Sequence, residues 1–250
     1  MNAYQFSTMN ALMLGHFESV EKVKDALEHG LVGIGTYEGL NGEAIIIDGC
    51  AYNGLPGGEI KQMDVETGMA FGIVAPVQMM GTVFQQKSVL NLESLKERAD
   101  EVRKAECKSD NFICFARIDG VFDSVTVRSC YQQNEPYAPM YEVAKSQVET
   151  TKNDVEGTLI GFWFPKYMES INLPGWHFHF ISADRKTFGG HCLECSLKSG
   201  LIGGKKITGL DLRLPEDSSF EKMDFNQDLR EKTASVEGKS QKNKNMSKKC

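Results

Sequence analysis

Three of the five histidines of this 250-residue chain lie close together, in GWHFHFISADRKTFGGHCLE (175–194). In a β-strand alternate side chains share a face, so His177 and His179 are expected to point the same way and the aromatic residues beside them the other way. The connector ADRKTFGG is rich in turn residues. The strand that follows it can return antiparallel and bring His191 opposite or diagonal to the first pair. Three converging imidazoles indicate a metal site.

A packed pair of strand histidines would explain His177 and His179 equally well. The third histidine favours the metal, because three neutral imidazoles crowded on one buried face need partners and one divalent cation serves them all. Three histidines with an open fourth position are typical of a catalytic centre that generates hydroxide, activates oxygen or polarises a carbonyl. A cupin-type oxygenase would also need a glutamate a few residues later, where this chain has Ala183 and Asp184.

Two nearby cysteines and the two remaining histidines are not expected to bind the metal. Cys192 and Cys195 are three residues apart, which on a regular strand places them on opposite faces. We therefore expect packed thiols there, with Cys192 facing away from the metal. His16 and His29 lie in polar, helix-like surroundings and are expected at the surface.

Two helices are predicted in the first half of the chain. The first covers 19–30, with Ser19 as N-cap and Gly30 at its end, and the second covers 91–106, with Asn91 as N-cap. Both have apolar residues at helical spacing.

Strand candidates make up most of the remaining sequence. Gly-Leu-Asn-Gly (39–42) and Asp-Gly (48–49) separate short β-rich runs, as in antiparallel hairpins. After residue 110 the sequence is mostly β-like, with one short helix near 139–149. Strands and helices do not alternate as in a doubly wound fold. The sequence thus predicts a mixed α+β (α/β) fold with mixed, largely antiparallel sheets and few helices.

The composition is that of an ordinary globular protein, with 41% hydrophobic and 25% charged residues. A net charge of −6 argues against nucleic acid or an anionic membrane as the main partner. No signal peptide or membrane-length apolar stretch is recognisable. Seven scattered cysteines favour free thiols in a reducing cytoplasm. The lysine-rich segment 238–250 is expected to be a disordered tail.

Nearly the whole chain apart from this tail resembles the alpha-acetolactate decarboxylase family, whose members convert acetolactate to acetoin and carbon dioxide. The resemblance begins at YQFSTMNALMLGHFE (4–18) and continues through GLVGIGTYEGLNGEAIIIDGCAY (30–52) and FARIDGVFDSVTVRS (115–129). It ends at LPEDSSFEKMDFNQDLREKTASVEG (214–238). The most specific part is Gly-Trp-His-x-His-Phe followed by Asp-Arg-Lys and Gly-Gly-His.

This resemblance implies a two-subdomain fold, a zinc ion and a homodimer. Polar stretches at 105–112 and 150–157 each offer a boundary between subdomains. We expect an N-terminal α/β subdomain over 1–110 and a C-terminal β-rich subdomain over 111–237 that carries the metal site. By position in the family's motifs, the zinc ligands are His177, His179 and His191.

The same resemblance implies roles for four further residues. Glu43 and Arg128 correspond to the family's active-site glutamate and arginine, and Thr36 to a residue that lines the substrate pocket. Glu237 corresponds to a second glutamate on the C-terminal segment. We expect zinc to hold the ketone and hydroxyl oxygens and Arg128 to orient the substrate. Glu43 is expected to donate a proton, with Glu237 as its helper or as a substrate-binding group.

Two alternatives stay open at this point. One is a different three-histidine metal enzyme, a hydratase or an oxygenase. The other is a metal-binding or sensory module that kept the fold without catalysis. The presence of Glu43, Arg128 and Glu237 beside the histidines favours an enzyme, because a sensor has no need of a proton donor.

Overall fold

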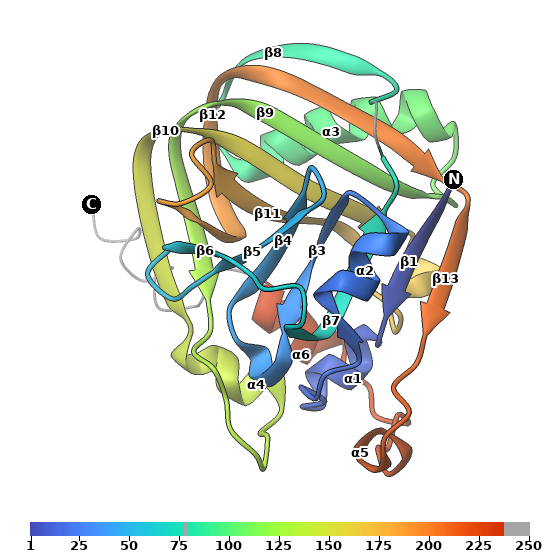
Figure 1. Cartoon of the computed structure of the whole chain (residues 1–250). Coiled ribbons are helices and arrows are strands. Elements are labelled where there is room, and N and C mark those ends of the chain that lie inside the picture. Colours follow the sequence, from blue (N-terminus) through green and yellow to red (C-terminus); the bar gives the residue numbers. More distant parts are fainter. Residues whose placement is uncertain (78–79, 238–250) are drawn as a thin grey trace.

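The computed structural model of the chain describes residues 1–77 and 80–237, so the predicted tail lies outside the described residues (Figure 1). The elements of its first half are β1 (Asn2–Phe6), α1 (Met9–Met13), β2 (Glu21–Lys22), α2 (Val23–His29), β3 (Val32–Tyr37), the 3-10 turn η1 (Glu38–Leu40), β4 (Glu43–Ile47), β5 (Cys50–Gly54), β6 (Ile60–Gln62), β7 (Gly68–Ala75), β8 (Val83–Val89) and α3 (Leu92–Cys107). Those of the second half are β9 (Ile113–Ser129), α4 (Met140–Val143), η2 (Ala144–Ser146), β10 (Val148–Phe164), η3 (Lys166–Met168), β11 (Gly175–Ser182), β12 (Gly189–Ile207), β13 (Gly209–Arg213), α5 (Ser218–Glu221) and α6 (Arg230–Glu237).

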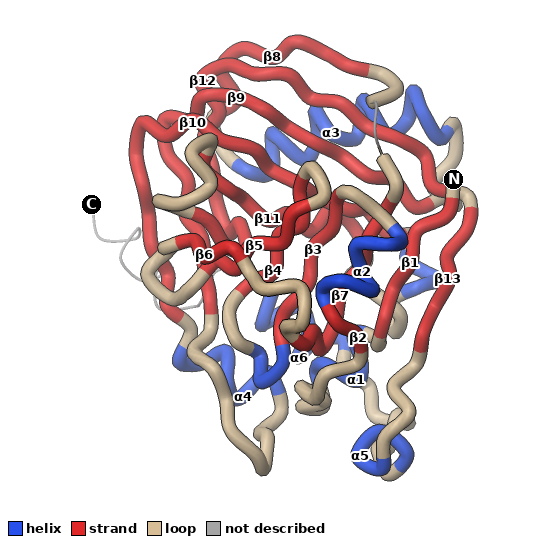
Figure 2. Tube along the Cα trace, viewed as in Figure 1, coloured by secondary structure: helices blue, strands red, loops and turns tan. Residues whose placement is uncertain are grey.

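The strands form two sheets, which dominate the chain trace (Figure 2). The first has the order β13-β1-β7-β3-β4-β5-β6, with β2 paired to β7, and only its β1–β13 pair is parallel. The second has the order β11-β10-β9-β12-β8 and is antiparallel throughout. The predicted mixed, largely antiparallel α+β fold is confirmed. A division into subdomains at residue 110 stays a prediction. Of the elements before that residue, β8 and α3 pack with the second sheet, and of those after it, β13 joins the first.

Three apolar clusters stack the elements in four layers. Val23 and Ala26 of α2 pack on one face of the first sheet. Its other face packs on the second sheet, through isoleucines of β3, β4 and β7 against Phe115 and Phe162. The far side of the second sheet is covered by α3, whose Leu95 is fully buried. No helix in the described parts of the chain is long and apolar enough to cross a membrane.

The second sheet closes on itself at one end. Strand β12 starts beside β11 and then pairs along β9, while β10 pairs with both β9 and β11. This closure brings the middle of β11, the start of β12 and the end of β9 together. The three histidines of the predicted metal site come from β11 and β12, and Arg128 comes from β9.

A further apolar cluster lies at one end of the sheets, where α1, α4 and α6 meet (Figure 1). It joins Met9 and Leu12 of α1, Met140 of α4 and Val236 of α6. Helix α1 was not predicted. Its N-cap is Thr8, whose hydroxyl oxygen accepts a hydrogen bond from the Ala11 amide at 3.2 Å.

The helix predicted at 19–30 is shorter than expected. Residues Glu21–Lys22 form β2 against β7, so α2 begins at Val23 and the prediction of Ser19 as N-cap is wrong. The helix does end at Gly30, in extended backbone with φ 178. Glycine is required there because a Cβ atom would lie 2.5 Å from the Ala75 backbone. The second helix begins as predicted, since Asn91 Oδ1 accepts a hydrogen bond from the Ser94 amide at 2.8 Å.

Candidate metal centre

The three histidines lie on the face of the second sheet that meets the first. His179 is directly opposite His191 across the β11–β12 pair, and His191 is directly opposite Arg128 across the β12–β9 pair. On its other side His179 pairs with Ile160, which belongs to the apolar cluster between the sheets. The predicted hairpin register is therefore confirmed. It buries all three rings, leaving His177 8%, His179 0% and His191 3% exposed.

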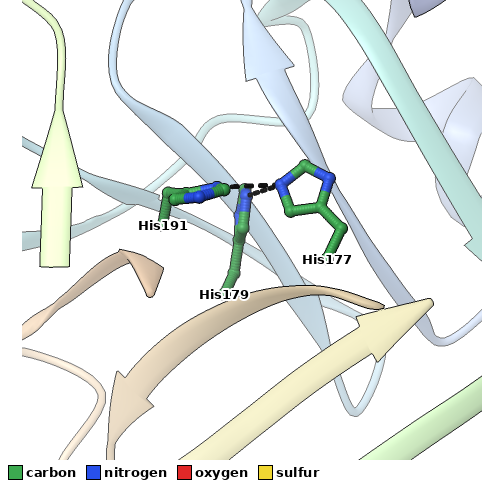
Figure 3. Close-up of side chains that lie close together, drawn as sticks. All are labelled: His177, His179 and His191. Atoms are coloured by element: carbon green, nitrogen blue, oxygen red, sulfur yellow. Dashed lines mark hydrogen bonds between the residues drawn. The ribbon is translucent and has the colours of Figure 1, made fainter. Parts of the chain in front are cut away.

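The three rings converge on one point (Figure 3). His177 Nε2 lies 3.1 Å from His179 Nε2 and 2.8 Å from His191 Nδ1. A tetrahedral ion with metal–nitrogen bonds of about 2.0 to 2.1 Å would separate its nitrogen ligands by about 3.3 Å. The observed spacing is close to that value. These residues could hold a metal ion.

A hydrogen bond that His179 donates to the first sheet fixes the tautomer of its ring. Its Nδ1 lies 2.9 Å from the carbonyl oxygen of Ala44 on β4. A carbonyl can only accept, so Nδ1 carries the hydrogen and Nε2 presents its lone pair to the other two rings. Such a support for the remote ring nitrogen is typical of metal-binding histidines.

The surroundings keep the rings of His177 and His191 neutral. Burial, then the charges of Arg128 and Lys96, lower the pKa of His177 from 6.5 to about 3. Burial and the Arg128 charge likewise hold the pKa of His191 well below its ordinary value. At neutral pH both imidazoles are therefore unprotonated, which is the form that binds metal ions.

Glu43 stands at the first position of β4 and is 8% exposed. Its Oε2 lies 3.5 Å from His179 Nε2. The turn before it is tightly held, because Thr36 Oγ1 donates to the Gly42 carbonyl at 2.8 Å. Gly42 has φ +74, and a Cβ atom there would lie 2.0 Å from Asn53 Oδ1. The sequence Asn-Gly-Glu thus places the carboxyl group beside the histidines.

Arg128 lies near the end of β9 and is only 1% exposed. Its Nη1 donates to Gln147 Oε1 at 3.3 Å. A guanidinium group stays charged even when buried, so its position beside neutral imidazoles makes the site attractive to an anion. Arg128 is the second-last residue of the 17-residue strand β9, and the end of this strand lies beside the histidines.

One small cavity of about 20 Å³ adjoins all of these side chains. The structure thereby brings together six of the seven residues predicted for the site: Thr36, Glu43, Arg128, His177, His179 and His191. The seventh, Glu237, is the last residue of α6, and its side chain lies outside the described part of the chain.

Sequence reasoning missed the apolar half of the cavity. It is lined by five residues of the cluster at the end of the sheets: Met9, Leu12, Leu40, Phe71 and Met140. A signal existed for α1, since Thr8 is a good N-cap and Met9 and Leu12 follow at helical spacing. The carbonyl of Ala44 left no signal, because every residue has one.

The prediction that Cys192 and Cys195 face opposite sides is wrong. The register of β12 against β9 shifts between Cys192 and Glu194, which is a β-bulge that reverses the alternation. Both thiols lie in the core under α3, where a hydrogen bond with Cys192 and burial raise the pKa of Cys195. Cys192 does face away from the histidines, as expected.

The surface position predicted for His16 is also wrong. His16 is fully buried, and its Nε2 lies 2.8 Å from Asp217 Oδ2, just before α5. His29 is exposed and stacks on Tyr4, with ring centroids 3.7 Å apart. Neither ring is near the three clustered histidines in the cavity.

The family model and the relatives that match this chain carry the same description. Residues 3–227 match the family model described as alpha-acetolactate decarboxylase. The alpha-acetolactate decarboxylase of Methanosarcina mazei is 34% identical over 235 residues, 94% of this chain and 79% of the relative. That of Klebsiella aerogenes is 34% identical over 217 residues, 87% and 81% of the two chains.

The fold agrees with these matches. The crystal structure of alpha-acetolactate decarboxylase from Bacillus subtilis strain 168 superposes with a TM-score of 0.89 at 27% identity, covering 96% of this chain and 100% of that one. The chain therefore belongs to the alpha-acetolactate decarboxylase family, a family of carboxy-lyases.

Proposed function

We propose that the protein catalyses the metal-dependent decarboxylation of 2-acetolactate to acetoin and carbon dioxide. The observation that carries the proposal is one cavity lined by three buried histidines, a carboxyl group and a guanidinium group, in a member of this family. In the reaction the bond to the carboxylate carbon breaks, and its electron pair stays on the carbon beside the ketone. The site must spread this charge and then supply a proton.

The groups that would hold the metal are the converging nitrogens His177 Nε2, His179 Nε2 and His191 Nδ1. A bound divalent ion supplies a Lewis acid that draws negative charge onto the substrate oxygens. We propose zinc, because three imidazole ligands with an open position are typical of catalytic zinc sites. The convergence and burial of the rings support this choice.

Arg128 is proposed to orient the substrate. Its planar guanidinium group suits the carboxylate or the neighbouring oxygens, to which it can donate two hydrogen bonds. Burial beside the histidines strengthens this attraction, since the charge is poorly screened by water. Arg128 would thus hold the carboxylate of the substrate in a fixed orientation before carbon dioxide is released.

Glu43 is proposed as the proton donor, because its carboxyl group is buried and lies 3.5 Å from a ring of the proposed metal site. A donor must be within hydrogen-bond reach of the carbon that takes the proton. Thr36 positions the turn that carries Glu43 and lines the cavity. We propose that Glu237, at the end of α6, assists Glu43 or the substrate.

We further propose that the enzyme is a cytoplasmic homodimer whose three metal-binding histidines belong to a C-terminal subdomain. The family resemblance supports the dimer and the subdomains. Within the described residues the six cysteines are free thiols, which fits a reducing compartment.

The test is an acetoin assay on the purified protein. Acetolactate should yield acetoin and carbon dioxide, a chelator should abolish the yield, and added zinc should restore it. Metal analysis of the same samples should find zinc with activity. Zinc-loaded protein that releases no carbon dioxide, or that instead hydrates a substrate or consumes oxygen, would overturn the proposal.

A further inference from the structure

We infer that Met9 and Met140 set the size of the alkyl groups that the cavity accepts, and so select 2-hydroxy-3-oxo acids with methyl substituents. The inference rests on the proposed function and adds the side of the substrate that the polar residues do not recognise. Neither methionine belongs to the proposed catalytic set. Both side chains line the cavity and are almost fully buried.

The cavity has two chemically different walls. Strands β3, β4, β9, β11 and β12 supply the polar wall, which carries the histidines, Glu43 and Arg128. The rest of the lining is apolar and comes from α1, α4, the turn η1 and β7. A substrate whose carboxylate, hydroxyl and ketone face the polar wall must direct its two methyl groups at the apolar one.

The apolar wall has to yield when the substrate enters. A cavity of about 20 Å³ has room for about one water molecule, far less than acetolactate needs. The polar wall lies on strands that are hydrogen-bonded within the two sheets, whereas Met9 and Met140 lie on the short helices α1 and α4. Methionine is unbranched and adapts its shape readily, so Met9 and Met140 are the lining side chains best suited to move.

The space that Met9 and Met140 can open by moving is limited by the packing of α4 against α6. Helix α4 packs against α6, whose Val236 is buried in the same cluster as Met140. Lys232 of α6 also lies over the ring of Tyr141, with 4.2 Å to its centroid. A methyl group is accommodated by rotating a methionine, whereas a longer chain would have to push α4 into α6.

The experiment compares kcat/KM for acetolactate with that for its homologues carrying ethyl or propyl on the hydroxyl-bearing carbon. One additional methylene in an apolar pocket changes kcat/KM by about 10- to 200-fold, so the zinc-loaded wild-type protein should prefer methyl over ethyl by about 10-fold or more. Met140→Ala removes most of one wall side chain and should reduce this preference about 10-fold.

Met13→Ala is the matched control. Met13 lies on α1 in the same apolar cluster and is 0% exposed, yet it does not line the cavity. This variant should lose comparable stability and keep the wild-type preference. Folded, zinc-loaded Met140→Ala with an unchanged preference would overturn the inference, as would an equal change in Met13→Ala.

The wild-type protein decides the matter if Met140→Ala does not fold. A steep fall of kcat/KM from methyl to ethyl to propyl supports the wall, and equal values for the three overturn it while leaving the proposed function intact. Absence of turnover for all three substrates, acetolactate included, would overturn the proposed function and the inference with it.

Discussion

Acid should destabilise the metal-free protein through its buried histidines. In the folded protein the pKa of His177 is about 3, whereas its ordinary value is 6.5. As the pH falls through 6.5 the unfolded chain takes up a proton at this ring and the folded protein does not. Between pH 6.5 and about pH 3 the unfolded state binds more protons than the folded state. The free energy of unfolding therefore decreases as the pH is lowered through this range.

The size of the effect follows from the two pKa values. Between pH 7 and pH 5, His177 alone should lower the free energy of unfolding by about 2 kcal/mol. His191, whose pKa is lowered for the same reason, acts in the same direction. Against a typical stability of about 5 to 15 kcal/mol, this is a large change.

Urea unfolding at the two pH values, with a chelator present, measures the effect. In His177→Gln the side chain cannot titrate, so the wild type should lose about 2 kcal/mol more than the variant over the interval. Carboxylates titrate in both proteins and cancel in the comparison. His29→Gln, a change at an exposed histidine, should keep the wild-type response to pH. Equal losses in wild type and His177→Gln would show that the buried ring titrates normally, and would refute the reasoning.

Three further predictions concern the proposed active site. His191→Ala should remove the metal and acetoin formation together in metal analysis and assay, with His29→Ala as the unaffected control; full activity in His191→Ala would refute the metal assignment. Glu43→Gln should stay folded and zinc-loaded while turnover falls by about 100-fold or more, and near-normal turnover would exclude Glu43 as donor. Thr36→Val removes the hydrogen bond to the Gly42 carbonyl and should lower both kcat and, by about 1 kcal/mol, the free energy of unfolding. Thr36→Ser keeps the hydroxyl group and should retain both. Unchanged kcat in Thr36→Val would show that this bond does not position Glu43.

The histidine cluster could be predicted because its geometry is local. Alternation along β11 fixes His177 and His179, and a short hairpin fixes His191, so no distant pairing has to be known. The capping signals at Asn91 succeeded for the same reason. Local rules failed at Cys192 and Cys195, because one additional residue in β12 reverses the alternation and nothing in the sequence marks it.

The rest of the site depends on contacts between distant parts of the chain. The parallel pair of β1 and β13 joins residues near the two ends of the described chain, and short strands such as β1 have weak patterns. The apolar wall draws on α1, α4 and β7, which meet only in the folded protein. The roles of Glu43 and Arg128 came from the family resemblance, since either could be a surface residue by pattern alone.

The bond between His179 and the Ala44 carbonyl has a consequence for substitutions elsewhere on β4. Ala44 directly follows Glu43, so a single strand both carries the acid and orients one imidazole. A change that displaces β4 will move the carboxyl group away from the ring, which stays attached to β11, and will break the hydrogen bond that orients that ring. Such variants should therefore misplace the proposed proton donor and also bind the metal less tightly, because one of its three ligands is no longer held in position.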